Sequence, residues 1–350
     1  PAYPPAPYPD GGAEEHPVIP VEPVQLTSDI AEHTAPVFTT DGSAVLAVRE
    51  DYEREHRDLR TALVSLPVTG GKAGVILSAS DGFRIARAAV AGDGRTAMLA
   101  SRPAQGRDSV APDVALWLLE EAGPRRLTDP ETLDVASSGA DLEVLGPDFL
   151  VRRLTRGRTH LLRVARDGAV TAVLEGDVSV EGADAVATAS GTLVLATRST
   201  PETCGALVAL DGQNPPRTLV DTGQALRDAG LAAPRELEIE GRSGYPVHGW
   251  LATPGGEGPF PTILMIHGGP YAAYGISVFD EVQTLVAAGY AVAYCNPRGS
   301  AGYGRAHGRA VRRAFGTVDY EDVIDFLDGA LEADDRLDAE QLGIMGGSYG

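Results

Sequence analysis

The sequence is short of cysteine and long apolar runs, and it lacks common metal-binding motifs; each shortage excludes a class of protein. Its two cysteines, Cys204 and Cys295, are too few for a disulfide framework, so we expect a protein of the reducing cytoplasm. No run of 18 or more apolar residues occurs, which argues against a membrane-spanning helix. Neither an HExxH motif nor a pair of CxxC motifs is present, so we expect no metal ion and no cofactor.

Positive charge is scarce as well. Lys72 is the only lysine, and the 29 lysine and arginine residues face 49 acidic residues, which gives a net charge of −20. Nucleic-acid binding needs a basic surface, so this balance argues against a nucleic-acid partner. With 350 residues, the chain is long enough for two domains that each bury a core.

The last five residues, GGSYG, fit the GxSxG pattern of a nucleophile elbow with Ser348 at its centre. In such an elbow a strand turns sharply into a helix, and flanking glycines allow the strained backbone that lifts the serine hydroxyl clear of the sheet. Leu342, Ile344 and Met345 form a short apolar run before it. This run predicts a buried parallel strand that leads into the elbow.

The elements upstream alternate between strand and helix. Short apolar runs predict buried strands over 262–266 and 290–295, and apolar residues at helical spacing predict helices over 277–288 and 318–331. Thr317 is the expected cap of the second helix. This order is typical of a doubly wound, mostly parallel α/β sheet, in which ligands bind beyond the carboxyl ends of the strands.

A glycine-rich loop, His267-Gly268-Gly269-Pro270, follows the first of these strands. Acyl transfer needs hydrogen-bond donors aimed at the oxyanion of a tetrahedral intermediate. Two backbone N–H groups are expected to supply them, those of Gly269 and Tyr349, with the Tyr271 hydroxyl as the next candidate. The alternative is that the glycine-rich loop is an ordinary turn.

Four stretches of the sequence are distinctive: HGGPY at 267–271, NPRGSAGYG at 296–304, the DYEDVIDFL helix, and DRLDAEQLGIMGGSYG at the end. Together they resemble the prolyl oligopeptidase family of serine peptidases, most closely its acylaminoacyl-peptidase-like branch. The resemblance covers roughly residues 235–350. It implies an α/β-hydrolase domain joined to a β-propeller, which cleaves short peptides or N-blocked aminoacyl peptides through an acyl-enzyme. Ser348 is then the nucleophile, and the N–H groups of Gly269 and Tyr349 form the oxyanion hole. A homo-oligomer is a separate expectation.

The sequence departs from that family's pattern in its catalytic triad. In α/β-hydrolases the acid and the histidine follow the serine, but only Tyr349 and Gly350 follow Ser348 here. None of the seven histidines is a plausible substitute; His267, for example, belongs to the oxyanion loop. We therefore interpret the chain as part of a longer enzyme that supplies the acid and the base elsewhere.

The first two-thirds of the chain consist of short apolar runs separated by turns. Four strand-turn-strand segments have their turns at Gly42, Gly94, Pro147 and Gly191, about 44 to 53 residues apart, which suits four-stranded propeller blades. Further turns at Asp167-Gly168 and Asp211-Gly212 indicate hairpins within blades. We predict a β-propeller-like domain over 24–230 with about four recognisable blades. A β-sandwich is the alternative.

Several other features have a structural and a functional interpretation. Residues 1–23 are proline-rich and indicate a linker, and 231–350 is the expected hydrolase part. The acidic cluster Glu50, Asp51, Glu53 and Glu55 could bind a peptide amino terminus, although a solvated charged loop is favoured. Arg298 is expected to organise its loop. The functional alternatives are an esterase or small-molecule amidase on the same fold, or a non-catalytic propeller scaffold.

Overall fold

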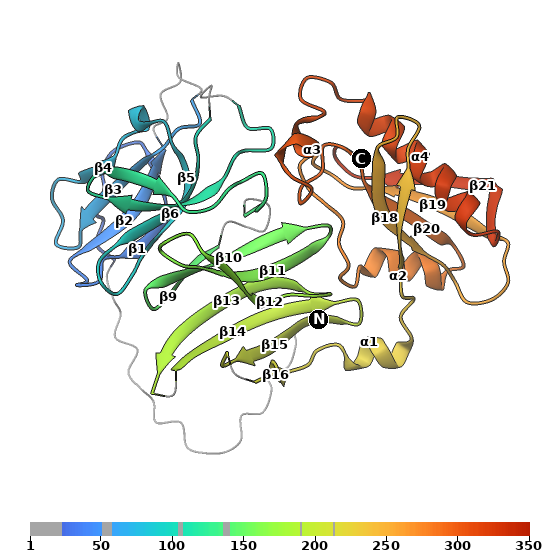
Figure 1. Ribbon diagram of the computed structural model, residues 1–350, viewed down its shortest axis with the longest axis horizontal. Coiled ribbons are helices and arrows are strands. Elements are labelled where there is room, and N and C mark those ends of the chain that lie inside the picture. The colour runs from blue at the N-terminus through green and yellow to red at the C-terminus, as the bar shows by residue number, and fades with distance from the viewer. Residues whose placement is uncertain (1–22, 51–57, 104–107, 136–140, 190, 213) are drawn as a thin grey trace.

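The computed structural model describes residues 23–50, 58–103, 108–135, 141–189, 191–212 and 214–350. Most of the predicted linker and Asp51, Glu53 and Glu55 of the acidic cluster lie outside these residues. Figure 1 shows two regions side by side: a β-rich region made of strands β1–β16, and a C-terminal region in which helices flank a five-stranded sheet. The helix α1 (Gln224–Ala229) lies between them, next to the predicted boundary at 230/231.

The β-rich region consists of four antiparallel units of four strands, each paired in sequence order. The units are β1 (Glu32–Phe38), β2 (Ala44–Glu50), β3 (Ala62–Pro67) and β4 (Gly74–Leu77); β5 (Arg84–Val90), β6 (Thr96–Ser101), β7 (Ala115–Glu120) and β8 (Gly123–Arg126); β9 (Leu142–Leu145), β10 (Asp148–Thr155), β11 (Arg158–Val164) and β12 (Val170–Leu174); and β13 (Ser179–Thr188), β14 (Gly191–Thr200), β15 (Thr203–Leu210) and β16 (Arg217–Val220). A short 3₁₀ helix, Ala79–Asp81, joins the first unit to the second.

The four predicted turns occupy the same place in each unit. Gly42, Gly94, Pro147 and Gly191 all lie at the hairpin between the first and second strands. The Asp-Gly turns at 167–168 and 211–212 lie between the third and fourth strands of the last two units. The repeat predicted from the sequence therefore corresponds to a repeated four-stranded unit, whereas a closed propeller remains a prediction.

Each unit packs against the next one along the chain. Because strand residues alternate between faces, Phe149 and Val151 of β10 enter the core shared with the second unit, whereas Leu150 enters the core shared with the fourth. Met98 and Leu99 of β6 divide in the same way between the first and third units. Both faces of the two middle units are thus buried. In a two-sheet sandwich, by contrast, each sheet keeps one face toward solvent.

The C-terminal region is built on a mixed sheet in the order β17-β18-β20-β19-β21. Its elements are β17 (Arg235–Glu240), β18 (Pro246–Ala252), β19 (Phe260–Ile266), α2 (Asp280–Ala287), β20 (Ala291–Asn296), α3 (Arg305–Arg309), α4 (Val318–Ala333) and β21 (Leu337–Gly346). The last three strands of the sheet are parallel, but the hairpin β17-β18 joins it in the antiparallel sense, so the sheet is less parallel than predicted.

Helices α2 and α4 cover opposite faces of this sheet. Val282 and Val286 of α2 pack against Met265 of β19, whereas Phe326 of α4 packs against Leu264. Both helices fall where the apolar spacing predicts them, but α2 begins at Asp280 rather than at residue 277. The preceding residues are held extended because the Val278 N–H donates to the Thr200 carbonyl of β14 at 3.2 Å.

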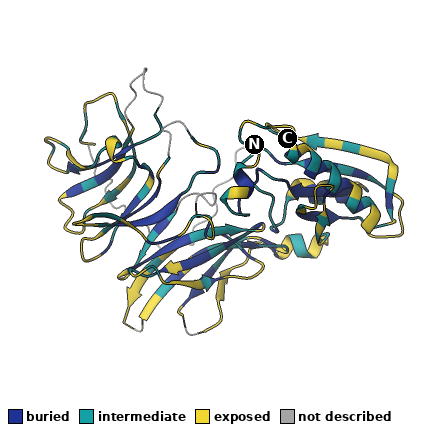
Figure 2. Ribbon diagram, turned by 45° about the horizontal axis from the view of Figure 1, so that its top comes forward, coloured by how far each residue is buried: buried dark blue, intermediate teal, exposed yellow. Residues whose placement is uncertain are grey.

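Two expectations for this region are wrong. The Thr317 side chain does not cap α4; its hydroxyl donates to the Ala314 carbonyl, and the Asp319 carboxylate accepts the N–H groups of Gly316 and Thr317 instead. Strand β21 is not buried either. Leu342 is 46% exposed and Ile344 is 67% exposed, because β21 lies at the edge of the described sheet and pairs only with β19 (Figure 2).

Candidate active site

Ser348 lies in a tight turn directly after β21. The strand ends at Gly346, and the Gly350 N–H donates to the Gly347 carbonyl at 3.1 Å. Ser348 has a φ of 59°, a left-handed conformation that is uncommon for residues other than glycine. Such strain is typical of a residue that the surrounding structure presents for a function, and the Ser348 side chain is exposed.

The two glycines of the GxSxG pattern are required by a close approach of two backbones. A Cβ atom on Gly350 would lie 2.2 Å from the Ile266 carbonyl oxygen, and one on Gly346 would lie 2.8 Å from the same atom. A Cβ atom on Gly347 would meet nothing within 4 Å. The turn therefore rests directly on the end of β19, where the glycine-rich loop begins.

The glycine-rich loop lies beside the serine. A Cβ atom on Gly268 would be 3.6 Å from the Ser348 Cβ. The next residue, Gly269, is exposed and has a φ of 130°. Within the described residues, neither the Gly269 N–H nor the Tyr349 N–H donates a hydrogen bond to the protein. The predicted site residues Ser348, Gly269 and Tyr349 are thus brought onto two adjoining loops whose two N–H groups have no acceptor.

His267 anchors this loop. Its Nδ1 donates to the Gly268 carbonyl at 2.6 Å, so its Nε2 accepts the hydrogen bond from the Ser300 hydroxyl at 2.9 Å. Burial lowers the pKa of His267, against a smaller opposing effect of the bond to Gly268. His267 is therefore a neutral structural side chain.

No histidine among the described residues bonds to Ser348. The five that the structure describes are engaged elsewhere: His33 lies 3.9 Å from Asp29, His160 bonds to the Gly176 carbonyl, His248 to Glu236 and Tyr303, His267 to Gly268 and Ser300, and His307 to Tyr245 and the Pro297 carbonyl. The described residues therefore place an exposed serine beside two N–H groups without an acceptor, and none of the described histidines bonds to that serine.

The Tyr349 side chain holds the elbow against α4. Its hydroxyl donates to the carboxylate of Asp319, a residue that is only 5% exposed. Burial alone would raise the pKa of Asp319, but the hydrogen bonds from Tyr349, Gly316 and Thr317 together lower it. Burial also raises the pKa of the Tyr349 hydroxyl. No local sequence pattern indicates this contact, which fixes the residue whose N–H is a proposed oxyanion donor.

Arg298 has the structural role expected from the sequence. Its guanidinium donates to both carboxylate oxygens of Asp322, which is 1% exposed, and its backbone N–H donates to Asp322 as well. The guanidinium also lies 4.6 Å from the centroid of the Tyr245 ring. The loop over 296–304 is thereby tied to α4, behind the glycine-rich loop.

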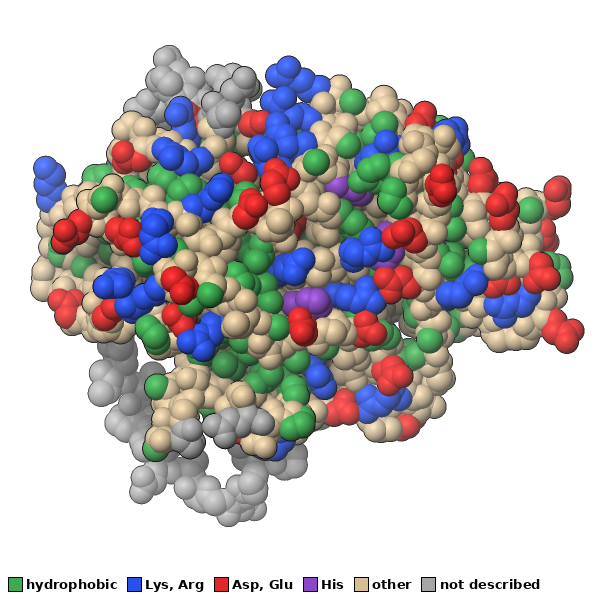
Figure 3. Space-filling model, viewed as in Figure 1, with side chains coloured by type: hydrophobic (Ala, Val, Ile, Leu, Met, Phe, Trp, Pro, Cys, Tyr) green, Lys and Arg blue, Asp and Glu red, His purple; other side chains and the backbone are tan. Residues whose placement is uncertain are grey.

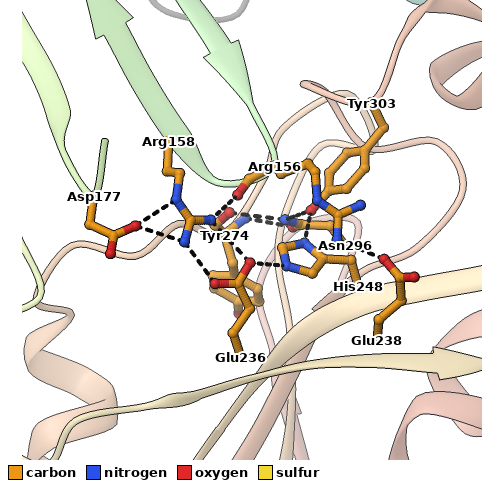
Figure 4. A network of polar contacts seen from close by, with 9 residues as sticks. All are labelled: Arg156, Arg158, Asp177, Glu236, Glu238, His248, Tyr274, Asn296 and Tyr303. Atoms are coloured by element: carbon orange, nitrogen blue, oxygen red, sulfur yellow. Dashed lines mark hydrogen bonds and ion pairs between the residues drawn. The ribbon is translucent and has the colours of Figure 1, made fainter. Parts of the chain in front are cut away.

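A polar network joins the β-rich region to the C-terminal region (Figure 4). Arg158 of β11 donates to both carboxylate oxygens of Glu236 on β17, which also accepts from His248 Nε2 at 2.6 Å. The bonds from Arg158 and His248 lower the pKa of Glu236 to about 2 against the effect of burial. Sequence reasoning missed this network because its partners lie about 80 residues apart.

The hairpin tip between β10 and β11 contacts the C-terminal region directly. A Cβ atom on Gly157 would lie 2.5 Å from the Trp250 ring, so only glycine fits. The Gly157 carbonyl accepts the Ile276 N–H at 3.0 Å, and the Arg156 N–H donates to the Gly302 carbonyl at 3.1 Å. A cavity of about 540 Å³ lies beside this junction and is lined by residues of both regions, including Leu154, Tyr271 and Phe279.

The part of the chain that the structure describes also bears on the expectations for metal ions, membrane spans, disulfides and surface charge. There, no cluster of three or more His, Cys, Asp or Glu residues could hold a metal ion, and no helix is long and apolar enough to cross a membrane. Cys204 and Cys295 are both free thiols. On the face seen in Figure 3, acidic and basic side chains are interspersed.

Comparison with known families gives a match over residues 276–350 to the prolyl oligopeptidase family. Among related proteins, the uncharacterized peptidase YuxL of Bacillus subtilis is 45% identical over 128 residues, which cover 36% of this chain and 20% of the relative. Acylamino-acid-releasing enzyme 1 of Oryza sativa is 33% identical over 90 residues, covering 26% of this chain and 12% of the relative.

Two solved structures resemble most of the chain. The Pyrococcus horikoshii acylaminoacyl peptidase matches with a TM-score of 0.74 at 20% identity, over 90% of this chain and 48% of its own. A Mycobacterium tuberculosis puromycin-hydrolyzing peptidase matches with a TM-score of 0.68 at 20% identity, over 93% of this chain and 51% of its own. The likeness shows a shared fold, and this chain spans about half the length of these solved relatives.

Proposed function

We propose that the protein is a serine peptidase that acts through an acyl-enzyme on Ser348, because residues 276–350 match the prolyl oligopeptidase family. The observation that carries the proposal is the position of Ser348. It has a φ of 59° and lies against Gly268 of a loop whose next N–H has no acceptor. An exposed, strained serine beside two open N–H donors is the arrangement that acyl transfer requires.

The chemistry assigned to these residues has two steps. In the first, the Ser348 oxygen attacks the carbonyl carbon of the scissile amide while its proton passes to a general base, and the resulting oxyanion accepts hydrogen bonds from the N–H groups of Gly269 and Tyr349. The C–N bond breaks as the base protonates the departing amine. In the second, water attacks the acyl-serine ester, releases the acid and restores the hydroxyl.

The general base and its acid must come from outside the described residues. Support for this part of the proposal is the engagement of all five described histidines with other partners. In α/β-hydrolases these two groups follow the serine along the chain. A serine without a base is a weak nucleophile, so the proposal depends on such a histidine.

We assign short peptides or N-blocked aminoacyl peptides as the substrate class. The similarity to an acylamino-acid-releasing enzyme and the fold shared with an acylaminoacyl peptidase support this assignment. We propose further that the C-terminal region is part of an α/β-hydrolase domain and that the β-rich region is part of a propeller that limits access to it; the four units packed in series support this. A cytoplasmic location, a possible homo-oligomer and the absence of nucleic-acid and membrane partners belong to the same proposal.

A small-molecule amidase is the second candidate. It is favoured by the fold shared with a puromycin-hydrolyzing peptidase, because acyl-enzyme chemistry by itself does not distinguish a peptide bond from another amide or an ester.

Labelling with a fluorophosphonate probe tests the nucleophile. We expect the protein to be labelled, Ser348→Ala to lose both labelling and turnover, and the control Ser80→Ala, at an exposed serine of the β-rich region, to keep both. Labelling that persists in Ser348→Ala would remove Ser348 from this role, and an unlabelled protein would favour a non-catalytic scaffold.

A substrate panel tests the substrate class. N-acetylated peptide amides, dipeptide amides with a free amino terminus, puromycin and simple esters are compared by kcat/KM. Turnover of esters or puromycin without any peptide amide would replace the peptidase assignment by the second candidate.

A further inference from the structure

Tyr271 connects the oxyanion loop to the β-rich region. It follows Gly269 by two residues, and its hydroxyl donates to Asp134 Oδ2 at 2.9 Å. The two residues are 137 positions apart in the chain and belong to different regions. The hydroxyl that the sequence suggested as a reserve oxyanion donor is therefore already directed toward a carboxylate.

Asp134 is well placed to act as an anchor. Its Oδ2 also accepts the Gly302 N–H at 3.0 Å, and its carbonyl accepts the N–H of Leu154 in β10 at 3.0 Å. Asp134 and Leu154 form an isolated antiparallel bridge. One carboxylate thus holds two loops of the C-terminal region against the edge of the third unit.

The Tyr271 ring has little room to move. A Cβ atom on Gly308 would lie 2.6 Å from Tyr271 Cε2, and the same atom would lie 2.7 Å from the Cβ of Ala111 in the β-rich region. The ring is therefore packed against α3 next to the junction of the two regions. This contact on one side of the ring and the bond from the hydroxyl to Asp134 together set the direction of the side chain.

A shift of Tyr271 is transmitted to Gly269 over a very short path. Only Pro270 separates them, and the Ala272 N–H donates to the Pro270 carbonyl at 2.8 Å, which closes a tight turn. The other end of the loop is held by the bond from His267 to Gly268. The loop is thus fixed at one end within the C-terminal region and at the other end by the β-rich region.

We propose that Asp134 is a positioning residue for the oxyanion hole: through Tyr271 it sets the direction of the Gly269 N–H, so that the hole is correctly formed only when the β-rich region is docked. This inference rests on the proposed function. It assigns to the β-rich region a part in the chemistry, in addition to any role in limiting access.

The test combines Asp134→Ala, Asp134→Asn, Tyr271→Phe and the Asp134→Ala/Tyr271→Phe double variant. We expect Asp134→Ala and Tyr271→Phe each to lower kcat about 10- to 100-fold with little change in KM, because a small misplacement of a catalytic group has an effect of this size. Asp134→Asn should lose less, because its amide oxygen can still accept. The double variant should lose no more than Asp134→Ala, because Asp134→Ala already removes the link to Tyr271 together with the bond from the Gly302 N–H.

The matched control is Glu238→Gln, which removes the charge of an exposed pair between Glu238 and Arg156 across the same junction. We expect this variant to keep normal kcat. Thermal unfolding of every variant identifies losses caused by misfolding, and Tyr271→Phe tests the idea even if Asp134→Ala fails to fold.

The outcomes separate the two proposals. If the unmodified protein is not labelled at Ser348, the proposed function itself is wrong. If it is active but Asp134→Ala keeps normal kcat while Tyr271→Phe does not, the Tyr271 hydroxyl acts directly and the positioning role is wrong. Equal losses in Asp134→Ala and Glu238→Gln, or multiplied losses in the double variant, would also overturn it.

Discussion

The two regions bury different kinds of polar group, and the difference identifies where specific chemistry resides. Among the described residues, the buried polar side chains of the β-rich region are hydroxyls with a single carboxylate: Thr61, Ser101, Thr128, Asp148, Thr159, Ser199 and Thr203. Those of the C-terminal region are mainly imidazole, amide and carboxylate groups: His248, Thr262, His267, Asn296, Ser300, His307, Asp319 and Asp322.

The buried hydroxyls of the first region complete local strand pairing. Thr61 accepts the Ile85 N–H and Thr128 accepts the Leu116 N–H, each at 2.9 Å. Several buried groups of the second region instead join separate segments: His267 bonds to Ser300, Asp322 to Arg298, and Asp319 to Tyr349. Away from the junction at Asp134, substitutions in the β-rich region are therefore expected to have small, local effects, whereas those in the C-terminal region are expected to affect both stability and turnover strongly.

The largest effect is expected from Asp322→Ala. It leaves the guanidinium of Arg298, whose side chain is 13% exposed, without its carboxylate, and breaking such a pair typically costs about 3 to 5 kcal/mol. Urea unfolding measures the loss. The matched control is Asp328→Ala, at an exposed position of the same helix, which should change stability by less than about 0.5 kcal/mol. Similar values for the two variants would remove the contrast between buried and exposed carboxylates.

Acid should destabilise the C-terminal region first. Burial lowers the pKa of His307 to about 4, whereas an unfolded histidine has a pKa near 6.5. Below pH 6.5 the unfolded state therefore binds the proton and the folded state does not, so stability falls as the pH drops from about 6.5 to about 4, by on the order of 3 kcal/mol. Burial lowers the pKa values of His248 and His267 as well, which adds to the same trend.

Unfolding free energies across this pH range test the assignment. The slope should be reduced in His307→Gln, whatever its absolute stability. An unchanged slope would mean that other groups cause the acid sensitivity.

Tyr349→Phe should have an intermediate effect. The sequence alone assigns a role only to the Tyr349 N–H and so predicts a mild effect, but the structure shows the hydroxyl donating to buried Asp319. Losing a hydrogen bond to a charged group costs about 1.5 to 3 kcal/mol, and we expect a several-fold lower kcat from the loosened elbow. Tyr320→Phe, at a side chain that is 61% exposed, is the control and should be neutral. Identical kcat values would show that the hydroxyl does not support the oxyanion hole.

The smallest effect is expected in the β-rich region. Gly94 has a φ of 84°, and a Cβ atom there would meet nothing within 4 Å, so Gly94→Ala should cost only the strain of a left-handed alanine, about 1 kcal/mol. Gly92→Ala, with equal space and no positive φ, should cost less. Thermal unfolding measures both, and kcat should stay normal. A large loss of activity in Gly94→Ala would contradict the expectation that residues of the β-rich region away from the junction do not affect turnover.

Local patterns in the sequence predicted the elements and the loops that carry the site. The apolar spacing over 318–331 predicted α4, the run over 262–266 predicted β19, and the glycines around Ser348 predicted a tight turn after β21. The exposure of Ile344 was not predictable, because an apolar run looks the same at the edge of a sheet as at its centre.

Contacts between distant residues left no local signal. The bonds from Tyr349 to Asp319 and from Tyr271 to Asp134 join residues 30 and 137 positions apart, and no local pattern in the sequence marks Asp319 or Asp134 as the partner of either tyrosine. The start of α2 was misplaced for a similar reason, since a carbonyl of β14 holds the residues before it extended. Such pairings depend on how whole units pack, which spacing rules do not describe.

The contact of Gly157 with Trp250 gives the protein a built-in optical reporter. Trp250 is 2% exposed, and the outer edge of its indole ring rests on the hairpin tip of the β-rich region. Any separation of the two regions would admit water to that edge and shift the indole emission to longer wavelength. The chain has only one other tryptophan, Trp117, within the β-rich core, so a Trp117→Phe variant would follow the opening of this single junction through intrinsic fluorescence.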